Sequence, residues 1–298
     1  MTLHQLPIAN KERVIIVGAG IGGLAASLRL SHMGYNVKVF ETAQTGGGKL
    51  RTITGQTGEI DIGPTVLTLL PVFQNLFKSV GEDIFEHVEL VRQKIIARHW
   101  WPDGETLDLY DDFETSRDAI LNFSGSDSAK EFEKYFYDTR DLFSCFDIPV
   151  MRNPNPSMLD MNRAVLNNPK ILFKMHPLRT LSSLLNYKFR DSRLQQLFGR
   201  YSTYVGGSPL ESPALLSLIW QAEARGVWSI KGGMKKLARV LEKLAKDRGA
   251  SFRYSTEVKE LNIKYDRLVS VTDNLNISHE ADKSVSYTHL RAHETTNY

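Results

Sequence analysis

The chain contains 298 residues, of which 42% are hydrophobic and 24% charged, and its formal net charge is +3 at pH 7. Its length favours about two domains, and its composition is that of a globular protein with ample core. A net charge of only +3 gives no reason to expect nucleic acid as a partner. No segment approaches the roughly 18 apolar residues of a spanning helix, and residues 1–10 lack the apolar core of a signal peptide.

The only cysteine, Cys145, excludes an internal disulfide and a multi-cysteine metal or iron–sulfur site within one chain. It lies among Leu142, Phe143 and Phe146, so we expect core packing rather than a nucleophile. A reducing, cytoplasmic compartment fits this use of cysteine.

Residues 14–24, VIIVGAGIGGL, predict a strand, a glycine turn and a helix. Gly18 permits the tight turn, Gly20 lets the backbone approach a pyrophosphate, and Gly23 lets the helix pack closely on the strand. The helix N-terminus presents free N–H groups and a partial positive charge to phosphates. This pattern predicts a dinucleotide site, and the alternative is a glycine-rich turn in another parallel sheet.

An acidic residue and a second glycine loop follow. The next strand, residues 37–40, ends at Glu41, whose carboxylate can accept hydrogen bonds from both ribose hydroxyls. Residues 45–52, TGGGKLRT, allow the backbone to lie against a ligand, and Lys49 and Arg51 bring two cations to the same place. Such a loop suits a flavin, which is larger than a nicotinamide cofactor; a flexible loop with solvated charges is the alternative.

Residues 59–65 predict a short strand and a Gly-Pro bend, and residues 98–109 predict a β-hairpin that turns at Pro102-Asp103-Gly104. The adjacent Trp100 and Trp101 point to opposite faces of a strand. One of them is expected in the core, while the other either lines a cavity or also packs.

Residues 112–225 are expected to be mostly helical. Residues 170–193 interleave apolar side chains with cations such as Lys170, Lys174 and Arg179, which predicts an amphipathic surface able to sit on anionic lipid. A helical cap with solvated charges is the alternative. One apolar helix face is indicated by the spacing of Phe132, Tyr135, Phe136, Thr139, Leu142, Phe143 and Phe146.

Residues 232–249 predict a helix that starts at two glycines and stops at Gly249, and strands follow at residues 251–254 and 256–263. From about residue 285 the sequence lacks clear periodicity. His289 and His293 have the spacing of a metal-binding pair on a helix, but no third ligand is evident, so we predict no metal site.

These motifs resemble the carotenoid desaturase branch of the FAD-dependent amine-oxidase-like superfamily. The resemblance is carried by the glycine turn with its acid, by Gly47-Gly48-Lys49 and by DIGPT at residues 61–65, and it extends from about residue 13 to about residue 262. Within this branch, residues 96–104, 197–209 and 219–228 are most similar to the 1-hydroxycarotenoid 3,4-desaturases, also called hydroxyneurosporene or methoxyneurosporene dehydrogenases.

The resemblance implies an α/β fold, in which a Rossmann-type FAD-binding domain carries an inserted, mostly helical substrate domain and is incomplete at the C-terminus. The FAD-binding domain is expected at residues 1–110 and 226–284, a helical, membrane-facing domain at 111–225, and a non-native tail at 285–298. The residues expected to bind FAD are Gly18, Ala19, Gly20, Ile21, Gly22, Gly23, Glu41, Gly47, Gly48, Lys49, Arg51, Gly63, Pro64, Thr65 and, through its backbone, Val258.

The implied activity is an FAD-dependent desaturation that introduces a C3–C4 double bond into 1-hydroxy acyclic carotenoids during carotenoid biosynthesis. A phytoene desaturase, another flavin oxidoreductase such as an amine oxidase, and a non-catalytic fragment are the alternatives. The lipid-soluble substrate implies a protein peripheral to the cytoplasmic or photosynthetic membrane, with oxygen or a quinone as electron acceptor. Desaturation also removes a proton, and the residue that takes it is not identified. His99, His176, Asp61 and Glu223 are candidates by chemistry alone, and each is more readily explained as structural.

Overall fold

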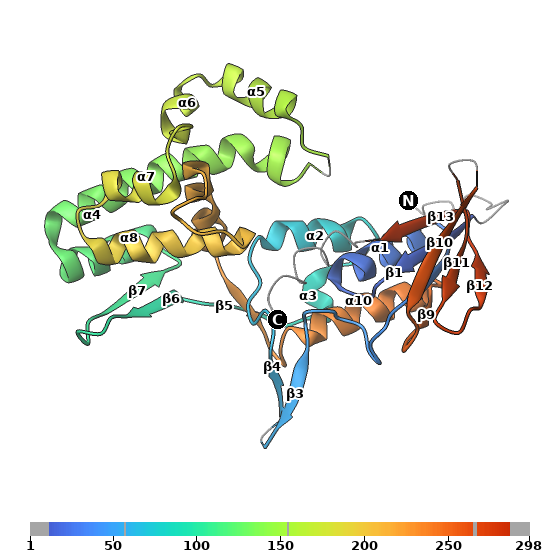
Figure 1. Ribbon diagram of the computed structural model, residues 1–298. Helices are drawn as coiled ribbons and strands as arrows, with labels where there is room; N and C mark the ends of the chain where they lie inside the picture. Colours follow the sequence, from blue (N-terminus) through green and yellow to red (C-terminus); the bar gives the residue numbers. More distant parts are fainter. Residues whose placement is uncertain (1–11, 57, 154, 265–266, 287–298) are drawn as a thin grey trace. The chain divides into compact units, whose positions relative to one another are not determined.

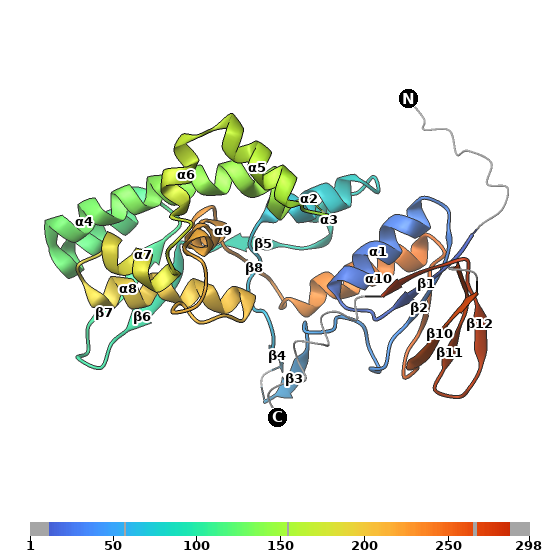
Figure 2. The same cartoon turned by 45° about the horizontal axis from the view of Figure 1, so that its top comes forward.

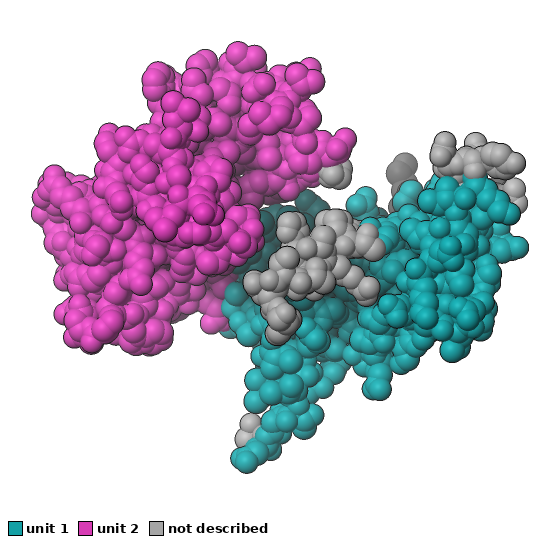
Figure 3. Space-filling view, viewed as in Figure 1, with its two compact units in different colours: residues 1–91, 228–298 teal, residues 92–227 magenta. Residues whose placement is uncertain are grey.

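The computed structural model describes residues 12–56, 58–153, 155–264 and 267–286. The chain forms two compact units, one made of residues 1–91 and 228–298 and the other of residues 92–227 (Figure 3). The sequence division put the first boundary at residue 110. The structure puts it at residue 91, because the hairpin that follows packs on the long helix of the second unit.

The first unit is built on a parallel four-stranded sheet in the order β13-β1-β2-β9. The strands are β1 (Arg13–Val17), β2 (Asn36–Phe40), β9 (Ser251–Arg253) and β13 (Lys283–Ser286). In register, Val14 lies opposite Val37 on one side and Lys283 on the other. The two central strands, β1 and β2, are rich in buried apolar residues because both faces of the sheet are covered there.

Helices α1 (Ile21–His32) and α10 (Lys235–Asp247) lie side by side on one face of this sheet (Figure 1, Figure 2). Val14 and Ile16 point to these helices, whereas Ile15, between them, packs on the opposite face against Val271. The helix predicted from its apolar spacing is confirmed as α10, in which Leu237, Leu241 and Leu244 are buried, as is Met234 at the N-cap.

The opposite face carries an antiparallel sheet of β10 (Val258–Lys264), β11 (Arg267–Asp273) and β12 (Ser278–Glu280). The rest of the unit comprises β3 (Thr52–Gly55), β4 (Gly58–Asp61), α2 (Leu70–Lys78), α3 (Ile84–His87), β5 (Leu90–Arg92) and β8 (Trp228–Ile230). Val285 and Ser286, assigned to the tail from the sequence, lie in β13 beside β1. His289 and His293 fall outside the described residues.

The second unit is mostly helical. Its hairpin, β6 (Ile95–Trp100) with β7 (Thr106–Tyr110), confirms the predicted turn. Trp101 packs on Phe123 with ring centres 5.0 Å apart, whereas Trp100 is exposed. The helices are α4 (Phe113–Phe146), η1 (Asp147–Met151), α5 (Met158–Asn167), α6 (Lys170–Met175), α7 (Leu181–Lys188), α8 (Ser192–Gly199), η2 (Arg200–Val205), η3 (Ala214–Trp220) and α9 (Gln221–Ala224).

An aromatic core holds this unit together. Phe132, Tyr135, Phe198 and Trp220 are buried, and the rings of Phe198 and Trp220 contact each other and those of both Phe132 and Tyr135, at centroid distances of 4.7 to 6.1 Å. The apolar face predicted for α4 is confirmed, because its members are buried or partly buried in the unit. No helix in the described part of the chain is long and apolar enough to cross a membrane.

Candidate FAD site

The glycine turn joins β1 to α1. Gly18 has φ +96°, a conformation that favours glycine, and its N–H donates to the Phe40 carbonyl at 2.7 Å. A Cβ at Gly23 would lie 1.9 Å from the Gly18 oxygen, so only glycine fits there. A Cβ at Gly20 would meet no described atom within 4 Å. Gly23 thus serves helix packing, while Gly20 borders open space at the N-terminus of α1.

Glu41 closes the turn from the end of β2. One carboxylate oxygen, Oε2, accepts the Ala19 N–H at 2.7 Å, and Oε1 accepts the Ala43 N–H at 2.8 Å and the Thr42 hydroxyl at 3.1 Å. A carboxylate has about four lone-pair sites, and these three bonds leave about one of them for a ribose hydroxyl, where the sequence predicted bonds to both hydroxyls. Glu41 therefore fixes the glycine turn as well as lining the cavity beside it.

The second glycine loop lies directly against the first. Gly47 donates to the Ala19 carbonyl at 2.8 Å, and a Cβ at Gly48 would stand 3.0 Å from the Gly20 Cα. Gly47 and Gly48 both have positive φ, at +122° and +59°. The third motif packs on this loop in turn, because a Cβ at Gly63 would lie 1.9 Å from the Lys49 oxygen.

A cavity of about 590 Å³ opens between the two loops and the start of β10. Of the residues predicted to bind the cofactor, Ala19, Arg51, Gly63 and Thr65 are not on its wall; the others are. The sequence did not indicate Val17, Phe40, Thr42, Leu50, Thr256, Glu257 and Ser286, which also line it.

These residues belong to no recognisable sequence motif. Several of them line the cavity because they end the strands of the parallel sheet: Val17 ends β1, Phe40 ends β2 and Ser286 ends β13. The Thr256 N–H donates to the Glu41 carbonyl at 2.9 Å, which brings the start of β10 beside β2. The cavity has a glycine cradle at a helix N-terminus and a carboxylate at the end of β2, which fits a dinucleotide. The glycine loops, Glu41, Lys49 and Val258 would hold FAD there.

The four acid–base candidates are not brought to this cavity. The Asp61 carboxylate accepts the Met234 N–H at 2.8 Å and so caps the start of α10. His176 lies beside Tyr187, and burial together with the Lys188 charge lowers its pKa. Glu223 is buried in the second unit, where its carboxylate pairs with the Arg200 guanidinium, and His99 is a partly buried residue of β6 in the same unit. No residue in this set acquires a catalytic role from its position.

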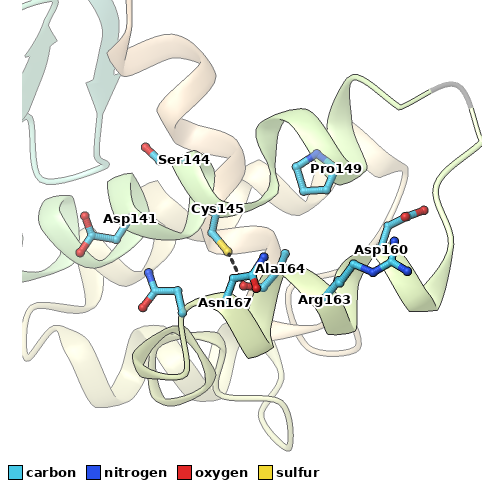
Figure 4. A pocket seen from close by; sticks show the side chains of 9 residues that line it. Asp141, Ser144, Cys145, Pro149, Asp160, Arg163, Ala164 and Asn167 are labelled. Carbon is cyan, nitrogen blue, oxygen red and sulfur yellow. Dashed lines mark hydrogen bonds between the residues drawn. The ribbon is translucent and has the colours of Figure 1, made fainter.

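Cys145 lines a separate cavity of about 520 Å³ in the second unit (Figure 4). Its thiol donates to the Ala164 carbonyl at 3.7 Å, and burial raises its pKa. A raised pKa disfavours the thiolate, so the position does not favour a nucleophile. The side chain is only partly buried, at the edge of the cavity rather than in the core. The cavity is lined by Asp141, Ser144, Cys145, Pro149, Asp160, Arg163, Ala164, Asn167 and Asn168.

Residues 21–292 match the profile of the flavin containing amine oxidoreductases. The chain belongs to this family. Membership of a flavin-containing family supports FAD as the occupant of the cavity. Two solved structures share the fold, an oxidoreductase from Methanosarcina mazei and a putrescine oxidase bound to putrescine. Their TM-scores are 0.63 and 0.62 at 18% and 16% identity, over 92% of this chain in both cases and over 58% and 57% of the neighbour. The expected α/β fold is confirmed.

Among curated members of the family, the chain is 44% identical to a hydroxyneurosporene desaturase from Cereibacter sphaeroides over 249 residues, which is 84% of the chain and 50% of the relative. It is 40% identical to a hydroxyneurosporene desaturase from Rhodobacter capsulatus, over 90% of the chain and 54% of the relative. A 4,4'-diapolycopene oxygenase from Methylomonas is 28% identical, over 88% of the chain and 52% of the relative. The chain spans about half the length of these relatives.

Proposed function

We propose that this chain is the FAD-binding and substrate-domain part of a carotenoid desaturase that forms the C3–C4 double bond of 1-hydroxy acyclic carotenoids. The supporting observation is 44% identity to a hydroxyneurosporene desaturase across both structural units, together with a cavity built for a dinucleotide. More distant relatives, at 28% identity, also carry names of enzymes that act on carotenoids.

Bound FAD would supply the acceptor for a hydride from the substrate carbon. The residues of this chain hold the cofactor. The N-terminus of α1 would bind the pyrophosphate, for which Gly20 leaves room, and Glu41 would accept a hydrogen bond from the ribose. The proton lost from the neighbouring carbon is not assigned to a residue. Oxygen or a membrane quinone is the proposed final acceptor of the electrons.

The substrate is too apolar to cross water freely, so we place the protein at a membrane surface on its cytoplasmic side. Segment 170–193 supports a membrane contact, but through exposed apolar side chains more than through the basic face that the sequence predicted. Lys174 and Lys188 are bound to the Asp138 carboxylate of α4, at 3.1 and 2.7 Å. Lys174 also pairs with the Asp141 carboxylate of α4 at 2.6 Å, so two carboxylates neutralise the two lysine charges within the fold. Arg190 likewise pairs with Asp127 at 2.9 Å.

Apolar side chains on the same segment remain exposed and carry the proposed contact. Phe173 and Leu178 are 80% and 99% exposed, and Lys170 has no ion pair among the described residues. Arg179 stacks on the ring of Tyr187 at 4.7 Å and keeps its charge outward. Exposed aromatic and aliphatic groups beside cations are typical of interfacial segments.

The activity is tested by supplying 1-hydroxyneurosporene, phytoene and putrescine to the chain continued to the length of its relatives, with FAD added. Desaturation of 1-hydroxyneurosporene is the expected result. Turnover of phytoene alone would assign a phytoene desaturase, and oxidation of putrescine alone an amine oxidase. Purification of the 298-residue chain as a yellow, monodisperse protein with a flavin spectrum would count against an inert fragment.

Membrane contact is tested by co-sedimentation of the chain with anionic vesicles at low salt. The variant Phe173→Ser with Leu178→Ser, and separately Lys170→Glu with Arg179→Glu, should each reduce the bound fraction. Each cation near an anionic surface contributes about 1 kcal/mol. Lys231→Glu with Lys243→Glu is the matched charge control, because both side chains are exposed elsewhere in the chain. Equal release by the control would show a general charge effect.

A further inference from the structure

The turn between β11 and β12, residues 274–277, is organised by the buried carboxylate of Asp273. One oxygen, Oδ1, accepts the backbone N–H groups of Leu275 and Ile277, both at 2.9 Å. The other oxygen, Oδ2, lies 2.8 Å from the His279 Nε2, and this bond is the main cause of the lowered pKa of Asp273. Because an ionised carboxylate only accepts hydrogen bonds, the His279 Nε2 is the donor.

Two contacts connect this turn with the wall of the proposed FAD cavity. The Asn274 Oδ1 accepts the backbone N–H of Glu257 at 3.3 Å, and Glu257 lines the cavity. The His279 ring packs on the ring of Phe40, with ring centres 4.8 Å apart, and Phe40 lines the cavity as well. Through Asn274 and His279, the Asp273 carboxylate therefore supports two separate parts of the wall.

The supported wall lies at the adenosine end of the cavity. In a dinucleotide site of this kind the acid at the end of the second strand, here Glu41, binds the adenosine ribose. The Thr256 N–H donates to the Glu41 carbonyl at 2.9 Å, so Glu257 and Val258, which follow Thr256, flank this acid. Val258 is also paired with Asp273 in the β10–β11 ladder. The base attached to this ribose is therefore expected beside the start of β10.

We propose that Asp273, Asn274 and His279 are positioning residues for the adenine of the cofactor, because they hold Glu257 and Val258 where the wall fits adenine and rejects guanine. This inference rests on the proposed function, which assigns FAD to the cavity. None of the three lines the cavity, so each acts through the wall.

The selection follows from the chemistry of the two purines. Adenine carries an amino group, a donor, at the position where guanine carries an oxygen, an acceptor. A wall held in one position matches only one of these edges and leaves polar groups unpaired against the other, whereas a wall that can move accommodates both. Loss of the support should therefore reduce the preference between the purines more than it reduces binding of the diphosphate.

The test measures the dissociation constants of ADP and GDP by titration calorimetry on the 298-residue chain, or on its length-extended form where only that form binds. ADP carries the adenosine and the pyrophosphate of FAD. GDP has the same ribose and diphosphate with the other purine, so the ratio of the two constants reports the base alone. A site that is merely weakened loses affinity for both nucleotides equally and keeps the ratio.

Four variants separate the roles. His279→Phe keeps a ring against Phe40 and removes the donor to Asp273, whereas His279→Gln keeps a donor. Asn274→Ala removes the acceptor for the Glu257 N–H. The matched control is Asn262→Ala, which deletes two side-chain bonds of the same antiparallel sheet, at 3.0 and 2.9 Å, with no contact to the turn.

The unmodified chain should bind ADP more tightly than GDP. His279→Phe should reduce this preference about tenfold, since a buried carboxylate loses its partner, and Asn274→Ala about threefold, since its bond is longer and partly exposed. His279→Gln should keep most of the preference, and Asn262→Ala should leave it unchanged. Thermal melting shows which variants fold. His279→Phe decides where it folds, and Asn274→Ala decides where it does not.

An unchanged preference in the deciding variant would overturn the inference. An equal loss in Asn262→Ala would also overturn it, because the whole sheet would then have loosened, and so would an unmodified chain that binds ADP and GDP equally. In these outcomes nucleotides still bind, so the proposed function stands. Failure of both the unmodified chain and its length-extended form to bind ADP or FAD would instead contradict the proposed function, and the inference with it.

Discussion

The Asp61 carboxylate accepts the backbone N–H of Met234 at 2.8 Å, across 173 positions of sequence. It ties the motif after the second glycine loop to the start of α10, which is the helix that packs beside α1. The four first N–H groups of a helix need partners outside it, and Asp61 provides one. Gly233 leaves room for this contact, because a Cβ there would lie 2.9 Å from the Asp61 Oδ2.

Asp61→Ala should therefore lower the free energy of unfolding by about 1 kcal/mol, the usual loss for a missing helix cap. Urea unfolding at neutral pH measures it. Glu59→Ala is the matched control, since that exposed carboxylate pairs with Arg239 on the surface and should change stability by less than about 0.5 kcal/mol. An equal effect in both variants would contradict a capping role for Asp61.

Two glycines of the first turn should separate cofactor binding from folding. Gly20→Val places its side chain where no described atom lies within 4 Å, so the fold should persist while the pyrophosphate is excluded. Gly23→Ala drives a Cβ to 1.9 Å from the Gly18 oxygen and should destabilise the fold itself by about 3 kcal/mol or more. Thermal melting and flavin absorbance after desalting distinguish the two. Retention of FAD by Gly20→Val would place the pyrophosphate elsewhere.

Glu41→Ala should weaken FAD binding by about 1–3 kcal/mol, because ribose hydroxyls would lose their acceptor in a cavity. It also removes the bond to the Ala19 N–H, so the glycine turn should loosen. Titration of the apoprotein with FAD measures the first effect, and hydrogen exchange at Ala19 measures the second. Glu41→Gln keeps an acceptor and should lose less. Unchanged affinity in both variants would show that Glu41 serves only the turn.

The local parts of the fold were predictable from the sequence, because a strand, a glycine turn and a helix are read from adjacent residues. Gly18 to Gly23 and the α10 helix are of this kind. The lysines of the segment 170–193 show the limit. Their spacing indicates a basic face, but their partner Asp138 lies 50 positions before Lys188 and nothing local links them. The sequence pattern therefore showed where the cations lie but not that the lysines are paired with carboxylates, so it overestimated the net positive charge of this surface.

The same limit applies to the candidate sites. His99 and Glu223 were recognisable as titratable residues, yet neither belongs to a local motif that joins it to Arg200 or Tyr204. The bonds from Arg200 and Tyr204 to Glu223 form because the fold brings η2 and α9 together, over 23 and 19 positions of sequence. Residues such as Thr256 line the FAD cavity through backbone position, which side-chain identity does not encode.

Asp191 predicts a dependence of stability on pH. The Arg193 guanidinium lowers its pKa most, burial opposes this, and the Ser124 hydroxyl adds to the lowering, which leaves the pKa at about 2 against an ordinary 3.8. Asp191 also caps α8 by accepting the Arg193 N–H at 2.8 Å. A carboxyl group whose pKa is lower in the folded state stabilises that state above its unfolded pKa. Its contribution is complete above about pH 4 and is lost as the pH falls toward 2.

Asp191→Asn should accordingly be less stable than the parent chain at pH 7, and the difference should shrink between pH 4 and pH 2. Urea unfolding of both proteins through this range measures the difference directly, and subtracting the two curves removes the acid sensitivity that they share. Asp127→Asn is the control, because Asp127 is exposed and its pair with Arg190 lies in water, where ion pairs contribute little. If the difference in unfolding free energy between Asp191→Asn and the parent stays constant from pH 7 to pH 3, the carboxylate charge does not stabilise α8. The loss of stability would then come from the amide group packing or hydrogen-bonding less well than the carboxyl group.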